Sequence, residues 1–105
     1  MEYSKLKEVL RKAVEKCIVP ESDLSITFEI TKFSSFESVE IGFKVYKGTD
    51  CETECTSFRF WDDGKAEKYW HFMDHSSIIE ISVDEALNEI KKFFEERGVN
   101  IDETV

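Results

Sequence analysis

The sequence predicts an α+β fold, with a helix at each end of the chain and one antiparallel sheet of four, possibly five, strands (order αββββα). Three observations predict it: apolar residues recur at helical spacing near both ends, two central segments alternate apolar and polar residues, and an Asp-Gly pair joins two aromatic-rich runs. Two amphipathic helices and half-apolar strands bury their apolar surfaces most simply in two layers. We therefore expect both helices on one face of the sheet and solvent on the other.

The first helix is expected to end before Pro20, which cannot continue a helix and disfavours helical backbone at Val19. Its basic side chains are interpreted as a solvated face. Its apolar stripe has helical spacing and consists of Leu6, Val9, Leu10, Ala13, Val14 and Cys17.

An antiparallel hairpin is expected next, with Ser34 and Ser35 in a short connection. A period of two in β-branched and aromatic residues indicates half-buried strands. The apolar positions are Leu24, Ile26, Phe28 and Ile30 in the first strand and Val39, Ile41, Phe43 and Val45 in the second.

A second hairpin is expected over residues 56–61 and 66–73, because Asp-Gly between such runs is a strong turn signal. A two-residue Asp-Gly loop would pair Phe58 with Tyr69, whereas one more residue would pair Phe58 with Trp70. We favour the second register because it joins four aromatic residues to the apolar strand faces. These residues are Phe58, Phe60, Trp70 and Phe72.

The last helix is marked at both ends, by a Ser82/Glu85 capping box and by Gly98. Residues 74–81 before it are interpreted as a loop or a short fifth strand. We expect one domain over residues 1–98 and a frayed tail over residues 99–105. The apolar stripe of the helix is Val83, Ala86, Leu87, Ile90, Phe93 and Phe94.

The charge is strongly acidic, with a net of −9 on 105 residues. Residues 1–20 carry five basic and three acidic side chains, so the remaining 85 residues sum to −11. Such a surface repels nucleic acid and anionic lipid and favours basic partners. The start of the chain does not resemble a signal peptide, and no apolar run is long enough for a membrane span. Three cysteines, an odd number, do not indicate a disulfide framework, so we expect a cytoplasmic protein.

One pattern suggests chemistry: Cys51, Cys55, His71 and His75 have spacing close to that of a zinc site. The context opposes zinc, because His71 lies in an expected strand and four residues along a strand span about 13 Å. The sequence also lacks a nucleophile elbow and a phosphate-binding loop. We therefore expect no metal, no cofactor and no enzymatic activity.

Bulky residues occupy both the odd and the even positions of the second hairpin, so they lie on both faces of its strands. The set expected to face outward is Trp61, Tyr69, His71 and Met73, with Tyr46 on the neighbouring strand. An exposed aromatic group rimmed by acids is typical of an interface. A small core beneath residues 74–81, or a contact between two copies, are the alternatives. The predicted partner-binding residues are Tyr46, Trp61, Asp62, Asp63, Glu67, Tyr69 and His71.

These observations predict a non-enzymatic interaction protein, monomeric or homodimeric, that binds and blocks a basic protein partner. Acidic side chains would steer association and occupy a surface meant for phosphates. An immunity protein for a nuclease toxin, or a phage inhibitor of a nucleic-acid-directed defence system, would have this character. Direct nucleic-acid or membrane binding is not expected. The alternative is a small-molecule or zinc-binding module, with a pocket between sheet and helices and the two cysteines and two histidines near its mouth.

Overall fold

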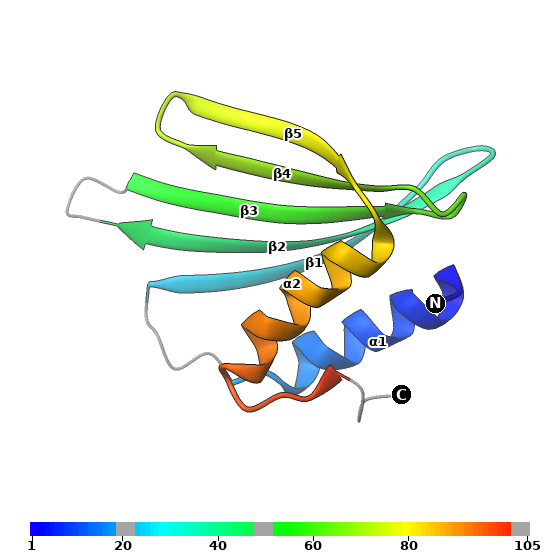
Figure 1. Ribbon diagram of the computed structural model, residues 1–105, viewed down its shortest axis with the longest axis horizontal. Helices are drawn as coiled ribbons and strands as arrows, with labels where there is room; N and C mark the ends of the chain where they lie inside the picture. Colours follow the sequence, from blue (N-terminus) through cyan, green and yellow to red (C-terminus); the bar gives the residue numbers. More distant parts are fainter. Residues whose placement is uncertain (19–22, 48–51, 102–105) are drawn as a thin grey trace.

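The described part of the chain folds into two helices on one side of a five-stranded sheet (Figure 1). The computed structural model describes residues 1–18, 23–47 and 52–101. Within them the strands form one antiparallel sheet in chain order, β1-β2-β3-β4-β5. The α+β prediction is therefore confirmed, and the uncertain segment before the last helix is a fifth strand. The elements are α1 (Tyr3–Lys16), β1 (Leu24–Lys32), β2 (Glu37–Lys47), β3 (Glu52–Trp61), β4 (Ala66–Phe72), β5 (His75–Ile81) and α2 (Val83–Glu95).

The first hairpin has the predicted faces. Ile30 pairs with Val39, and Phe28 pairs with Ile41. The connection over residues 33–36 is closed by the amide of Phe33, which donates to the carbonyl of Phe36 at 2.8 Å. The alternation in sequence therefore places every predicted apolar position of β1 and β2 on the same side of the sheet as the helices.

The register of the second hairpin differs from the favoured one. Phe58 lies opposite Lys68, not Trp70. The loop does have three residues, but they are 62–64: the amide of Trp61 donates to the carbonyl of Lys65, and Gly64 has φ +92°. A three-residue loop with glycine in the left-handed region is a common hairpin closure. The error in register is two residues, so the predicted faces hold.

The core lies between the sheet and both helices. Its largest fully buried side chain on the sheet is Phe60, which is 1% exposed. At the other end of the sheet the ring of Phe43 lies 3.9 Å, centroid to centroid, from that of Phe93 on α2. The remaining buried side chains include Leu6, Leu10, Ala13, Val39, Ile41, Ile90 and Phe94.

The chain beyond α2 is not frayed at its start, contrary to the prediction for residues 99–105. Val99 and Ile101 are 8% and 1% exposed and belong to the core. Gly98 adopts φ +79°, and the amide of Val99 then donates to the carbonyl of Phe94 at 2.9 Å. This is the Schellman closure, in which the residue after the glycine packs back against the last helical turn. Residues 102–105 lie outside the described residues.

The turn between β4 and β5 contains a strained residue. Met73 has φ +57°, the left-handed region that disfavours residues with a side chain. Met73→Gly is therefore expected to raise the free energy of unfolding by up to about 1 kcal/mol, net of the entropy that glycine loses on folding. Urea unfolding measures it. Met73→Ala is the control, because it removes the exposed side chain and keeps the strain. An equal gain in both variants would contradict the explanation.

Candidate functional site

The sheet face without helices carries its side chains in rows that cross all five strands. The strand register brings together residues far apart in sequence. The central row is Thr27, Gly42, Ser57, Tyr69 and Ile78. On one side of it lies a lysine row of Ser25, Lys44, Cys55, His71 and Ser76. On the other side lies a glutamate row of Glu29, Glu40, Arg59, Glu67 and Glu80.

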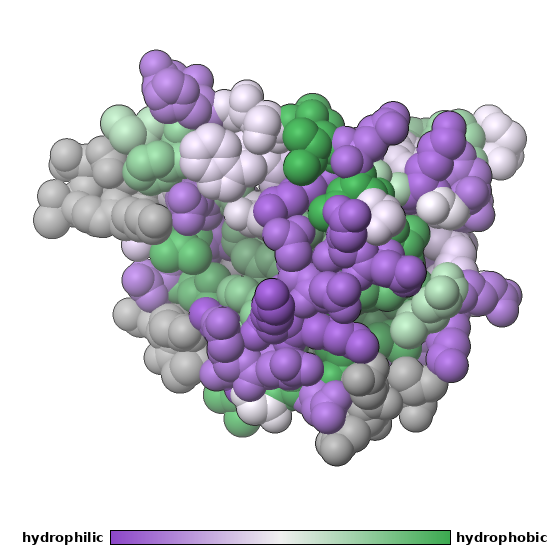
Figure 2. All heavy atoms as spheres, viewed as in Figure 1, coloured by the Kyte–Doolittle hydropathy of each residue, from purple (hydrophilic) through white to green (hydrophobic). Residues whose placement is uncertain are grey.

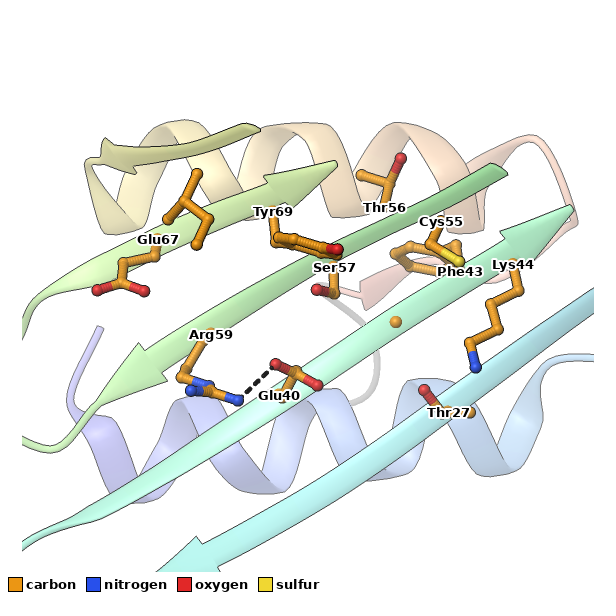
Figure 3. A pocket seen from close by; sticks show the side chains of 12 residues that line it. Thr27, Glu40, Phe43, Lys44, Cys55, Thr56, Ser57, Arg59, Glu67 and Tyr69 are labelled. Carbon is orange, nitrogen blue, oxygen red and sulfur yellow. Dashed lines mark hydrogen bonds and ion pairs between the residues drawn. The ribbon is translucent and has the colours of Figure 1, made fainter. Parts of the chain in front are cut away.

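The glutamate row places like charges side by side. Glu29 lies directly opposite Glu40, and Glu67 lies directly opposite Glu80. Arg59 sits between these pairs, and its Nη2 donates to Glu40 Oε2 at 3.0 Å (Figure 3). Like charges opposite one another on adjacent strands destabilise a sheet by about 0.2–1 kcal/mol. The row therefore places one like-charge pair on each side of Arg59, and each pair opposes the stability of the sheet.

A hollow of about 450 Å³ lies beside this row, over the small residues Gly42 and Ser57 (Figure 3). A side chain at position 42 would fill it, and its Cβ would lie 2.7 Å from Thr27 Oγ1. Arg59 and Tyr69 also line the hollow. The buried Nε of Arg59 has no hydrogen-bond acceptor among the described residues. The hollow therefore joins a carboxylate-rich rim to an aromatic wall and a donor that no described group uses.

The predicted outward aromatic group is not one cluster. Tyr69 and His71 lie together, with parallel rings 6.3 Å apart, and Tyr69 is 36% exposed. Tyr46, 47% exposed, lies opposite Thr53 at one end of the sheet. Met73 is exposed in the β4–β5 turn. The uncovered face therefore has one central pair of rings and further aromatic residues at its ends.

Trp61 belongs to an aromatic tip at the opposite end of the sheet. Its ring lies 6.1 Å from Phe33 and 5.7 Å from Phe36, and these two phenylalanines stack at 4.4 Å. Ser38, opposite Trp61, is only 2% exposed. The second small cluster that the sequence left open is therefore here, at the β1–β2 loop, rather than beneath β5. Neither Phe33 nor Phe36 was expected to contribute.

Two of the predicted acidic residues have structural bonds. Asp62 accepts a hydrogen bond from the amide of Glu37 at 2.9 Å, and its own amide donates to the carbonyl of Glu37 at 3.0 Å. Asp63 accepts from the amide of Lys65 and so stabilises the hairpin turn. Of the seven predicted partner-binding residues, Glu67, Tyr69 and His71 lie together on the uncovered face. The sequence reasoning missed Glu29, Glu40 and Glu80, although each occupies a polar position of its strand.

The four residues of the zinc-like pattern do not converge where the structure describes them. Cys55 and His71 are cross-strand neighbours on the uncovered face, whereas His75 lies opposite Phe72, on the side of the helices. Cys51 lies outside the described residues. Within the described ranges no three His, Cys, Asp or Glu side chains are grouped for a metal ion. A pocket of about 270 Å³ is lined by residues of both α2 and the sheet, but Cys55, His71 and His75 do not line it.

Glu37 ties α1 to the start of β2. Its Oε2 accepts from Lys7 Nζ at 2.7 Å and from the hydroxyl of Tyr3 at 2.9 Å. The hydrogen bond from Lys7, and then that from Tyr3, lowers the pKa of Glu37. Burial, followed by the hydrogen bond to Glu37, raises the pKa of Tyr3. The lowered pKa of Glu37 favours the folded state near neutral pH, where the carboxylate is charged. The raised pKa of Tyr3 means that ionisation of the phenol at high pH would oppose folding.

This arrangement predicts a loss of stability in acid. A lowered carboxyl pKa stabilises the fold above the ordinary glutamate value of about 4.3, and this contribution disappears as the pH falls through the lowered pKa. Glu37→Gln is expected to reduce the free energy of unfolding at neutral pH and to reduce it less at about pH 2.5. Urea unfolding at both pH values measures this, with Glu95→Gln as an exposed control. An equal destabilisation at both pH values would contradict the assignment.

Comparison of the chain with protein-family models, curated protein sequences and solved structures finds no match. No helix among the described residues is both long and apolar enough to cross a membrane. The uncovered face is an open, carboxylate-rich sheet surface with a shallow hollow.

Proposed function

We propose that this protein binds and blocks a basic protein partner through the uncovered face of its sheet. The observation that carries the proposal is the glutamate row, in which two carboxylate pairs face one another across adjacent strands around Arg59. A cationic partner would screen the repulsion within both pairs, so its binding would relieve strain that the free protein holds. The net charge of −9 also favours binding of a cationic partner.

The mechanism is electrostatic steering followed by local contact. The acidic surface attracts a positively charged one at a distance and raises the association rate. The partner's lysine or arginine side chains then meet the glutamate row, while Tyr69 provides an aromatic surface of the kind that anchors interfaces. A partner whose basic surface normally binds phosphates would be blocked. Inhibition of a nuclease toxin or of a nucleic-acid-directed defence protein fits this chemistry. A cytoplasmic location is part of the proposal, because an odd number of cysteines fits a reducing compartment.

The test is a pull-down of the tagged protein from nuclease-treated host lysate at low salt, with a salt step for elution and mass spectrometry for identification. We expect a stoichiometric basic protein that the salt step releases. At 0.1 M salt, interactions between exposed charges more than about 10 Å apart are already largely screened, and higher salt shortens this distance. A partner that is acidic, or that the salt step leaves bound, would contradict the electrostatic mechanism. Recovery of the tagged protein alone would contradict the proposal that the host contains a basic protein partner.

Small-molecule binding is a second candidate, favoured by the buried Arg59 Nε in the wall of the 450 Å³ hollow. A ligand with a carboxylate or carbonyl oxygen would supply the acceptor that this donor lacks among the described residues. Its site differs from the predicted one, because the hollow lies on the face opposite the helices. Ser57→Leu would fill the hollow, and it separates the candidates: it should abolish binding of a small ligand and leave the charge-driven capture of a basic protein largely intact.

A further inference from the structure

The strand β5 forms an edge of the sheet with little protection against pairing. An edge strand presents unpaired backbone amides and carbonyls, and proteins usually shield such edges with lysine, proline, bulges or a covering element. β5 (HSSIIEI) has neither lysine nor proline, and six of its seven residues are exposed. In the part of the chain that the structure describes, neither helix lies along its outer edge (Figure 1). The opposite edge strand, β1, lies beside α1 and carries Glu29 and Lys32.

Apolar side chains reach the surface on both faces of this strand. Ile78 belongs to the central row of the uncovered face and is 67% exposed, and Ile79, on the side of the helices, is 52% exposed. Figure 2 shows a strongly hydrophobic group at the surface, among pale and polar ones, near the upper margin where Figure 1 draws β5. A ligand on one face of the sheet would cover only one of the two isoleucines. An occupant that extends the sheet in its own plane would contact both and would also pair the backbone groups of the edge.

We propose that the occupant is β5 of a second copy of this chain, paired antiparallel to form one continuous sheet. A two-fold axis perpendicular to the sheet keeps the helices of both copies on one side. This axis pairs even-numbered residues with even-numbered ones and odd with odd, so paired side chains lie on the same face of the sheet. Ile78 is the middle residue of His75–Ile81. Centred there, the whole strand pairs with itself: His75 with Ile81, Ser76 with Glu80, Ser77 with Ile79, and Ile78 with Ile78.

The side chains fit this self-pairing. Glu80 meets Ser76 of the other copy, so no carboxylate faces a carboxylate across the new pair of strands. The two Ile78 side chains meet at the axis, and the Ile79 side chains lie diagonal to one another on the opposite face, within the reach of cross-strand contacts. Moving the axis to Ile79 would place Glu80 opposite Ile78 and leave His75 and Ser76 without partners in β5. The strand therefore matches itself best at its own centre.

The net charge of −9 on each copy opposes this association, and salt screens that repulsion. The dimer should therefore become tighter as the salt concentration rises. Binding of a basic partner should become weaker under the same change. The opposite salt dependence means that the dimer and the proposed function can fail independently.

Sedimentation equilibrium of the full chain, over a range of protein and salt concentrations, tests the dimer. We expect a reversible transition from the 12.3 kDa chain to twice that mass, with a dissociation constant that falls as salt is added. Ile78→Lys should raise the dissociation constant roughly tenfold or more, because two like charges would meet at the axis. It also lowers the net negative charge, so weaker association could not be attributed to overall repulsion. Ile30→Lys is the matched control, since Ile30 is an exposed isoleucine of the other edge strand.

A purely monomeric chain, an assembly larger than two copies, or a dimer that survives Ile78→Lys but not Ile30→Lys would overturn the proposal. Circular dichroism of both variants establishes that each still folds. Two single-cysteine variants test the register of the paired strands. Ile78→Cys should form an intermolecular disulfide under mild oxidation, because the two positions face one another at the axis. Ser76→Cys should not form one beyond the level of the native chain, since the two copies of position 76 would lie about 13 Å apart along the strands. Cross-linking of Ser76→Cys in preference to Ile78→Cys would overturn the register.

Discussion

Replacing Glu29, Glu67 and Glu80 together by glutamine is expected to weaken binding of the basic partner by roughly tenfold to a hundredfold, while making the free protein more stable. Binding should weaken because three carboxylates of the glutamate row are lost. Stability should rise because both like-charge pairs disappear, at about 0.2–1 kcal/mol for each pair. Glu40 is kept, so that Arg59 retains its ion pair. Titration calorimetry with the captured partner and urea unfolding measure the two effects.

The control variant replaces Glu2, Glu95 and Glu96, three exposed glutamates at the ends of the helices. Both triple variants change the net charge from −9 to −6. Overall attraction to a cation is therefore matched, and only the position of the lost charges differs. An equal loss of affinity in the two variants would mean that binding follows net charge and that the glutamate row is not the site.

The second large effect concerns the core. Phe60→Ala is expected to reduce the free energy of unfolding by about 3–5 kcal/mol, a large share of the roughly 5–15 kcal/mol of a typical domain. Phe60 is 1% exposed and lies between Val39 and Ala66 on the neighbouring strands, so little can move in to fill the space. The midpoint and slope of urea unfolding give the value.

Phe33→Ala is the matched control for the core prediction. Phe33 is 46% exposed and stacks on Phe36 in the aromatic tip, so its loss is expected to reduce stability by only about 1 kcal/mol. If Phe60→Ala reduced stability no more than Phe33→Ala, the core could not be centred where the helices meet β2 and β3.

The faces of the strands could be predicted from the sequence, but their register could not. Alternation assigns Phe58 and Trp70 to the same side whether they are opposite or two residues apart. The pairing depends on which three residues form the loop, and the sequence Asp-Asp-Gly-Lys allows two choices. The structure uses 62–64, where Gly64 takes the left-handed conformation that the closure requires.

The glutamate row could not be predicted from the sequence, because it too depends on the strand register. Its members are spread from Glu29 to Glu80, and each looks like an ordinary solvated position of its own strand. They become one row only when four strand pairings are all fixed, and a shift of two residues in any of them would break it. β5 was uncertain because both its faces are exposed, so it lacks the apolar alternation that marks a half-buried strand.

The end of the chain carries a signal for burial that the prediction of a frayed tail does not use. Gly98 marks the end of the helix, and two apolar residues, Val99 and Ile101, follow it. A Schellman closure brings the residue after the glycine back to the helix, so an apolar residue there predicts further packing. Both residues are buried as a result.

The central claim is that the partner contacts the uncovered face, and β5 contains its own internal control. Ile78 and Ile79 are adjacent, both exposed, and point to opposite sides of the sheet. NMR of isoleucine methyl groups during addition of the captured partner compares them directly. The account predicts that the Ile78 methyl signals shift with the partner while those of Ile79 change little. Shifts confined to Ile79 would place the partner on the side of the helices and contradict the claim.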